Sequence, residues 1–143
     1  MIILDTNAVS AMMKNPADPV VVSWLNRQAP RNIRTTAITV MEIQFGIAIM
    51  PAGRRRAELE ARLEIMLAGP FQGRVLAFEQ RAARTAALLA ARLRLIGKPM
   101  EVRDNQIAGV ALEHQAVLAT RNIRHFREAG LKLIDPWAEG RLD

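Results

Sequence analysis

The chain has 143 residues, of which 50% are hydrophobic and 24% are charged, a composition that is typical of a folded globular protein and argues against disorder. The length corresponds to a single domain over residues 1–143, and the absence of cysteine excludes disulfides and thiolate metal sites. The formal net charge of +6 favours a nucleic acid or an acidic protein as partner. The alternative interpretation is a soluble protein whose surface is basic without such a partner.

Location and mode of binding can also be judged from what the sequence lacks. No apolar stretch approaches the roughly 18–20 residues needed to cross a bilayer, and no secretory signal pattern is present at the N-terminus. We therefore expect a cytoplasmic protein without membrane contact. Aromatic residues make up only 4% of the chain, so contacts to nucleic acid should run mainly through its backbone rather than through stacked bases.

Apolar strand candidates alternate with helix candidates along the chain, which is typical of βαβ units around a parallel sheet. The predicted strands are Ile2–Leu4, Ile33–Ala37, Val75–Phe78, Val117–Ala119 and Leu131–Ile134. The predicted helices begin at Thr6, Asp18, Thr39, Gly53, Glu79, Arg103 and Asn122. The helix Glu79–Ile96 is rich in alanine, which permits close approach by a neighbouring helix or subunit, although helix propensity explains the alanines equally well. The order of elements predicts an α/β fold.

An acidic residue directly follows the first predicted strand. Ile2–Leu4 is a short continuous apolar run, as expected of a buried parallel strand, and Asp5 ends it. Open α/β sheets bind ligands at the carboxyl ends of their strands. A carboxylate buried there is costly unless it is hydrogen-bonded, paired or bound to a metal. Asp5 is therefore a candidate metal ligand.

Two further acids are predicted at the same edge of the sheet. Glu42 lies near the start of the helix that follows the second strand, and Asp104 lies in the first turn of a later helix. Because strand ends and the following helix starts share one edge, the three carboxylates can converge. Clustered carboxylates suit Mg²⁺ or Mn²⁺, which lower the pKa of bound water and stabilise charge on a phosphate.

Each acid also has a purely structural interpretation. Asp5 and Asp104 could serve only as helix N-caps. The sequence Thr39-x-x-Glu42 fits a capping box, which would place Glu42 in a first helical turn for structural reasons. The combination is more informative than any member, because three caps on one sheet edge would still form an acidic pocket.

Polar and basic residues beside these acids are candidate substrate contacts. Asn122 follows the strand Val117–Ala119 and either caps a helix or supplies an amide near the metals. Thr6 and Asn7 can bond Asp5 or a phosphate, or merely hold the turn. Arg121 is a candidate phosphate contact, as are its neighbours Arg124 and Arg127. His114 and His125 have no metal-ligand spacing and are interpreted as structural or exposed.

Several short motifs occur in an order that resembles PIN-domain proteins, specifically VapC-type toxins of the FitB-like branch. The resemblance covers nearly the whole chain. The motifs are Ile3-Leu4-Asp5-Thr6-Asn7, Thr39-Val40-Met41-Glu42-Ile43 with Gly46-Ile47, Pro51-x-Gly53-Arg54-Arg55-Arg56, Phe71-x-Gly73-Arg74-Val75-Leu76, Asp104-x-x-Ile107-Ala108, Leu118-Ala119-Thr120-Arg121-Asn122 and Asp135-Pro136-Trp137. Two positions depart from the family pattern: Asn122 replaces an acid, and His125-Phe126 stands where many relatives have Asp-Phe.

The resemblance implies a three-layer α/β/α domain with a central, mainly parallel sheet. It also implies a metal-dependent endoribonuclease in which Asp5, Glu42 and Asp104 bind Mg²⁺ or Mn²⁺ and Asn122 lies near a fourth acidic position. The implied partners are an RNA substrate, a second copy in a homodimer, and a cognate antitoxin that occludes the site and helps the complex to bind promoter DNA.

The expected chemistry is hydrolysis of an RNA phosphodiester bond. A metal held by Asp5 and Asp104 would activate water, with Glu42 assisting directly or through water. The competing hypothesis is a non-catalytic module of the same fold that acts as a partner or DNA-complex subunit, a role for which Asn122 leaves room. A metal-dependent phosphatase is less favoured, because Asp5 lacks the second nearby aspartate of common aspartyl-phosphate motifs.

Overall fold

A computed structural model describes residues 1–139 of the chain, so the last four residues of the predicted single domain lie outside the described residues. The described part contains a five-stranded sheet in the order β3-β2-β1-β4-β5, and each neighbouring pair is parallel. The strands are β1 (Ile2–Leu4), β2 (Ile33–Thr36), β3 (Val75–Leu76), β4 (Val117–Ala119) and β5 (Lys132–Ile134). The prediction of a parallel α/β sheet is thus confirmed.

The helices follow the predicted order along the chain. They are α1 (Thr6–Met13), α2 (Pro19–Asn26), α3 (Ala37–Ala48), α4 (Arg54–Ala68), α5 (Gln80–Leu95), α6 (Val102–Glu113), α7 (Ile123–Phe126) and α8 (Pro136–Glu139). Short 3₁₀ turns occupy Pro30–Asn32 and Arg127–Ala129. The predicted start of α2 is correct, because the Asp18 carboxylate accepts a hydrogen bond from the Val20 backbone N–H at 3.0 Å. Among the described helices, none is long and apolar enough to span a membrane.

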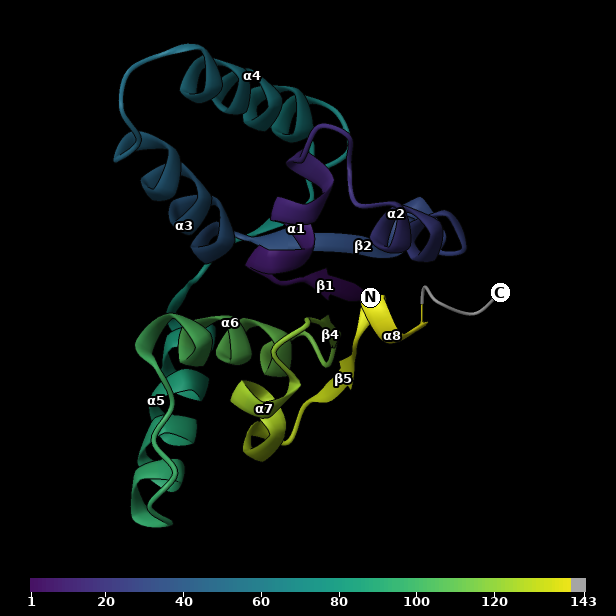
Figure 1. The fold of residues 1–143 in the computed structure, drawn as a ribbon. Helices are drawn as coiled ribbons and strands as arrows, with labels where there is room; N and C mark the ends of the chain where they lie inside the picture. The colour runs from purple at the N-terminus through teal and green to yellow at the C-terminus, as the bar shows by residue number, and fades with distance from the viewer. Residues whose placement is uncertain (140–143) are drawn as a thin grey trace.

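The sheet separates two layers of helices, as the α/β/α expectation requires. Figure 1 shows α1, α3 and α4 on one side of the strands and α5, α6 and α7 on the other. Successive residues of a strand point to opposite faces. Accordingly, Leu4 of β1 packs among residues of α1 to α4, whereas Ile3 packs among residues of α5 and α6. The central strand therefore contributes to both cores.

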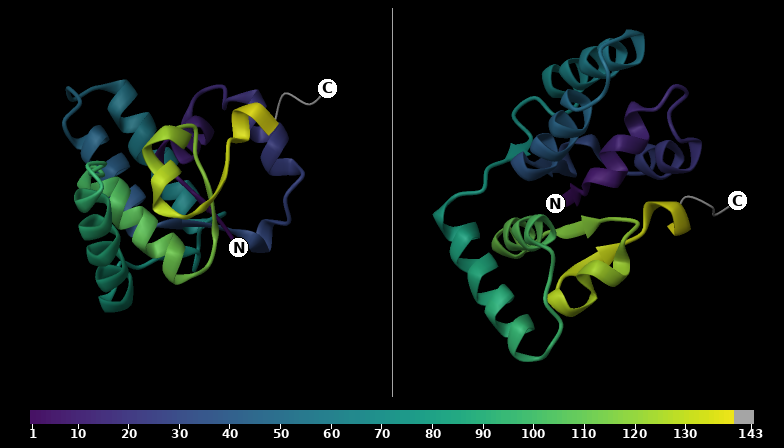
Figure 2. Two further views of the ribbon diagram at one scale, coloured as in Figure 1. Left: turned by 90° about the horizontal axis from the view of Figure 1, so that it is seen from below. Right: turned by 60° about the vertical axis from the view of Figure 1, so that its left-hand side comes forward.

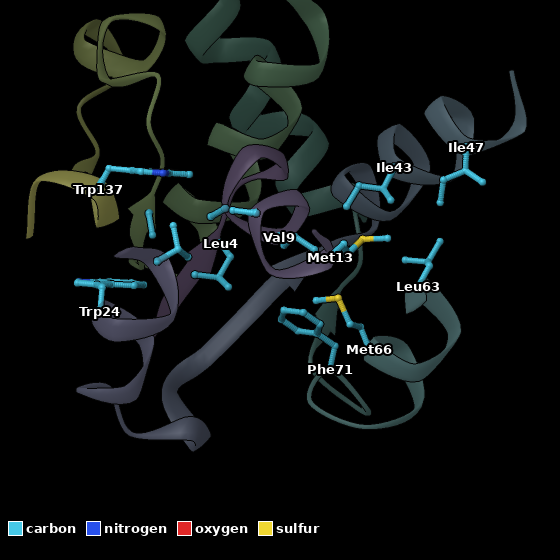
Figure 3. Packing of buried hydrophobic residues seen from close by; sticks show 14 residues of the cluster. Leu4, Val9, Met13, Trp24, Ile43, Ile47, Leu63, Met66, Phe71 and Trp137 are labelled. Atoms are coloured by element: carbon cyan, nitrogen blue, oxygen red, sulfur yellow. The ribbon is translucent and has the colours of Figure 1, made fainter. Parts of the chain in front are cut away.

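The core on the first face extends from the C-terminal helix to α4. Trp24 and Trp137 lie at one end of this cluster, and Leu63, Met66 and Phe71 lie at the other (Figure 3). The indole N–H of Trp137 donates to the Asp18 carboxylate at 3.0 Å, which satisfies its buried polar group. This contact ties α8, which the sequence did not predict as a helix, to the start of α2.

The second face is built on close packing of α5 against α6, which lie side by side in Figure 2. Ala82 and Ala86 of α5 are buried, and they face Gly109 of α6. A Cβ at position 109 would lie 2.7 Å from the Ala86 Cβ and 2.8 Å from the Ala82 carbonyl oxygen. The alanines of α5 thus permit close approach by a neighbouring helix, which was one of the two interpretations of this segment.

Candidate active site

Asp5 lies at the carboxyl end of β1 and is only 3% exposed. It is the N-cap of α1, since its Oδ1 accepts from the Thr6 backbone N–H at 2.8 Å. Its Oδ2 accepts from the Thr120 hydroxyl at 2.7 Å and from the Asn7 amide at 3.4 Å. The capping interpretation is therefore correct, but it accounts for one carboxylate oxygen and leaves the other directed toward the residues after β4.

Glu42 reaches the same edge from α3, although not from its first turn. The N-cap of α3 is Thr36, whose hydroxyl accepts from the Thr39 backbone N–H at 3.1 Å. The predicted capping box Thr39-x-x-Glu42 is wrong, because helical geometry begins at Ala37 and puts Glu42 beyond the first turn. Its Oε1 instead accepts from the Thr6 hydroxyl at 3.0 Å. Capping thus gives no structural explanation for this carboxylate.

Asp104 lies in the first turn of α6, as predicted, but it is not the N-cap. Glu101 caps α6 by accepting from the backbone N–H groups of Arg103 and Asp104 at 2.9 and 3.1 Å. The Asp104 side chain is left for another contact, and its Oδ2 lies 3.1 Å from Nδ1 of His125. The capping interpretation of Asp104 is therefore wrong.

The segment after β4 brings the remaining candidates to the site. Asn122 stands at the N-cap position of α7, but its side chain makes no capping hydrogen bond. Its backbone N–H donates to the Thr120 hydroxyl at 3.0 Å. Asn7 accepts from the Arg121 backbone N–H at 3.2 Å, which links the loops after β1 and β4. The amide of Asn122 is thus not used to cap α7.

The three acids line one hollow, which we call the acid hollow. It has a volume of about 430 Å³. Its lining residues are Asp5, Thr6, Asn7, Ser10, Ala11, Lys14, Glu42, Asp104, Arg121, Asn122 and Trp137. The guanidinium of Arg121 lies over the Trp137 ring, 4.9 Å from its centroid, so a cation–π contact holds this cation at the rim. The structure thereby brings together all seven residues predicted for the site.

The carboxyl groups of the site influence one another electrostatically. Burial raises the pKa of Asp5, and the neighbouring Asp104 charge raises it further against hydrogen bonds from Thr120 and Thr6. Burial likewise raises the pKa values of Glu42 and Asp104 above their usual range. Raised carboxyl pKa values mean that the site disfavours three negative charges, and a bound cation would relieve this penalty.

The ligand types fit a hard divalent cation, because carboxylate oxygens are the donors that Mg²⁺ and Mn²⁺ prefer. Within residues 1–139, no three aspartate, glutamate or histidine side chains are grouped closely enough to hold an ion as they stand. Each carboxylate is held by a neighbour instead: Asp5 by Thr120, Glu42 by Thr6 and Asp104 by His125. The donor set fits the metal, and these partners fix the orientation of each donor.

Sequence reasoning missed two residues that contact the acids. Thr120 is fully buried and bonds Asp5, although its motif was singled out only for Arg121 and Asn122. His125 was interpreted as structural or exposed, and its side chain is indeed 56% exposed, but its ring contacts Asp104. His125 lies three residues after Asn122, in a segment already assigned to the site, and this position could have identified it from the sequence. Of the neighbouring arginines, Arg124 lines a hollow beside the acid hollow, and Arg127 lines neither of the two.

Comparison with known proteins identifies the class to which this geometry belongs. Residues 2–131 match the PIN domain family. The chain is 41% identical over 137 residues to the VapC ribonuclease Y4jK of Sinorhizobium fredii, covering 96% of this chain and 98% of that protein. It is 32% identical to the toxin FitB of Neisseria gonorrhoeae, covering 96% and 99%. A structure of FitAB bound to an IR36 DNA fragment superposes with a TM-score of 0.87 at 31% identity, covering 96% of each chain.

The chain therefore belongs to the PIN-domain family, a class of nucleases built on this parallel α/β/α fold. Its full-length relatives place it among the VapC-type toxins of toxin–antitoxin systems, in the branch that includes FitB. The resemblance inferred from the sequence motifs is thus confirmed.

Proposed function

We propose that this toxin is a divalent-metal-dependent endoribonuclease that hydrolyses RNA phosphodiester bonds in the cytoplasm. The observation that supports the proposal most strongly is the convergence of Asp5, Glu42 and Asp104 on one hollow at the carboxyl edge of the sheet. Capping leaves one oxygen of Asp5 unexplained and accounts for neither Glu42 nor Asp104. A similar chain, from Sinorhizobium fredii, carries the name ribonuclease.

In the proposed mechanism, Asp5, Glu42 and Asp104 would hold Mg²⁺ or Mn²⁺. The ion, when bound, supplies a water of lowered pKa and neutralises charge on the reacting phosphate. Thr120 and Asn7 orient Asp5, Thr6 orients Glu42, and His125 orients Asp104. The guanidinium of Arg121, held over Trp137, attracts the RNA backbone to the rim. Asn122 offers an uncharged amide where an acid would add further repulsion.

The experiment that tests this proposal is cleavage of a structured RNA by the purified, chelator-treated protein. We expect no cleavage in excess EDTA and full cleavage after Mg²⁺ or Mn²⁺ is added back, because the phosphates are repelled by the carboxylates without a cation. Gel analysis of labelled RNA gives the rates. RNA that stays intact at all metal concentrations would favour the non-catalytic alternative, and cleavage that persists in EDTA would contradict the metal-dependent mechanism.

The structure also offers a surface for an antitoxin, the type of partner present in a toxin–antitoxin complex of similar fold from Klebsiella pneumoniae. A hollow of about 310 Å³, here called the apolar hollow, lies between α1, α3 and α4 and is lined largely by Met13, Ile43, Ile47, Met50 and Leu59. It shares Thr6, Ser10, Lys14 and Glu42 with the acid hollow. An apolar antitoxin segment in this hollow would reach the acids and occlude them, and the complex would bind promoter DNA.

Leu59→Glu should abolish co-purification with the antitoxin; unchanged co-purification would exclude this surface.

A second copy of the chain is the partner expected at the exposed side of α3. Met41, Phe45 and Ile49 are 49%, 58% and 67% exposed and follow one another at four-residue intervals, so they lie on one helix face. Exposed apolar faces of this kind mark interfaces. We expect Phe45→Glu to convert a dimer into a monomer in sedimentation velocity experiments. An unchanged dimer would place the interface elsewhere.

A further inference from the structure

A third hollow also adjoins the acid hollow, and the proposed mechanism assigns no ligand to it. We call it the flanking hollow; it has a volume of about 640 Å³ and lies between the end of α5, the start of α6 and α7. Its lining residues are Glu42, Leu93, Lys98, Pro99, Met100, Glu101, Arg103, Asp104, Asn122, Arg124, His125 and Glu128. It shares Glu42, Asp104 and Asn122 with the acid hollow. A strand whose phosphate lies at the acids can therefore place a neighbouring nucleotide beside this hollow.

The flanking hollow has the size and surface that a nucleotide requires. Its volume falls within the range of small-molecule sites, roughly 300–1,000 Å³. Pro99 and Met100 give it an apolar surface against which a base can pack. Three cations, Lys98, Arg103 and Arg124, line it within reach of a phosphate. Apolar surface for a base and cations for its phosphates thus occur together.

The cations differ in how far they are already paired. Lys98 contacts Glu128 at 2.9 Å, and Arg103 contacts Glu101 at 3.1 Å. Among residues 1–139, Arg124 has no acidic partner within ion-pair distance. A cation whose charge is not already paired gains most from a phosphate. Arg124 is therefore the residue best placed to bind the backbone in this hollow.

From this arrangement we propose that the flanking hollow is a binding subsite for the nucleotide of single-stranded RNA next to the scissile phosphate, with Arg124 on its phosphate and Met100 against its base. The proposal rests on the ribonuclease function proposed above and adds to it the residues that hold the neighbouring nucleotide. A base can enter a hollow only when it is splayed out of a helix, which single strands allow and duplexes oppose. The shape of the hollow then contributes to base preference at one side of the cleavage site.

The first test is fluorescence anisotropy with a short fluorescein-labelled single-stranded RNA, in an Asp5→Asn background so that the RNA stays intact. This substitution also removes one of the three carboxylate charges that repel phosphate when no metal is bound. Arg124→Ala should weaken binding about fivefold and reduce the slope of log K against log salt by about 0.7, the value for one phosphate contact on a single strand. Arg127→Ala is the matched control, because Arg127 lines neither hollow, and it should leave both quantities unchanged. Equal effects of the two substitutions would overturn the proposal.

The second test maps cleavage sites on a mixed-sequence RNA in the wild-type background. Met100→Trp fills the hollow and should change the base preference at one flanking position while thermal melting shows an intact fold. An unchanged cleavage pattern in the folded variant would also overturn the proposal. If the unmodified protein cleaves no RNA, the ribonuclease function fails, but the comparison of Arg124→Ala with Arg127→Ala still decides whether RNA binds in this hollow.

Discussion

Asp5→Asn is expected to lower the rate of RNA cleavage on the order of a thousandfold or more while leaving the fold intact. The substitution removes one negative charge from the acid hollow, and the loss of metal-mediated charge stabilisation amounts to several kcal/mol in the transition state. Stability should be retained or increased, because burial raises the pKa of Asp5 and so disfavours its charged form in the folded state. Single-turnover cleavage and thermal melting of the same sample measure the two effects.

Asp135→Asn is the matched control for this substitution. Asp135 also follows a strand, β5, and its carboxylate accepts from the Trp137 backbone N–H at 2.9 Å, but it does not line the acid hollow. Its asparagine variant should cleave RNA at the wild-type rate. Full activity in a folded Asp5→Asn protein, or an equal loss in both variants, would contradict the assignment of Asp5.

Gly109→Ala is expected to reduce the free energy of unfolding by about 2 kcal/mol, although alanine is the better helix former. An added methyl would lie 2.7 Å from the Ala86 Cβ and 2.8 Å from the Ala82 carbonyl oxygen, so α5 and α6 must move apart. Overpacking of this kind costs about 1–3 kcal/mol, and two contacts shorter than 3.0 Å put the cost at the upper end of this range. A gain in helix propensity of roughly 1 kcal/mol then leaves a net loss of about 2 kcal/mol. Urea denaturation measures the difference.

Gly46→Ala provides the opposite expectation in the same experiment. Gly46 lies inside α3, and a Cβ there would meet no heavy atom within 4 Å. Helix propensity then acts alone and should stabilise the protein by up to roughly 1 kcal/mol. If both substitutions changed stability in the same direction, close packing of α5 on α6 could not be the reason for Gly109.

Much of the fold can be predicted from the sequence because its signals are local. Buried apolar runs define β1 and β4 to the residue, and the Asp18-Pro19 pair defines the start of α2. The start of α3 was misplaced because Thr36 and Thr39 are equally plausible caps; the choice depends on where β2 ends in the sheet. The same local signal, Asp135-Pro136, precedes α8 but was not interpreted as a helix start. Trp137 of this helix is fixed by a contact with Asp18, 119 residues earlier.

The acids that line the candidate site could be predicted from the sequence, but their side-chain contacts could not. Strand-end topology places Asp5, Glu42 and Asp104 on one edge, which requires no knowledge of side-chain contacts. The partners of these acids come from distant segments: Thr120 is 115 residues from Asp5, and His125 is 21 residues from Asp104. A sequence pattern cannot reveal which hydroxyl or imidazole meets which carboxylate, because the sheet order decides it.

The most direct test of the central claim, that the three acids form one divalent-metal site, is calorimetric titration of the chelator-treated protein with Mn²⁺. We expect saturable binding that is lost in Asp5→Asn and in Asp104→Asn but retained in Glu64→Gln, an exposed acid on α4. Binding should also weaken as the pH falls through the raised carboxyl pKa values, because protons compete with the metal. Equal Mn²⁺ binding by the wild type and both aspartate variants would contradict the account.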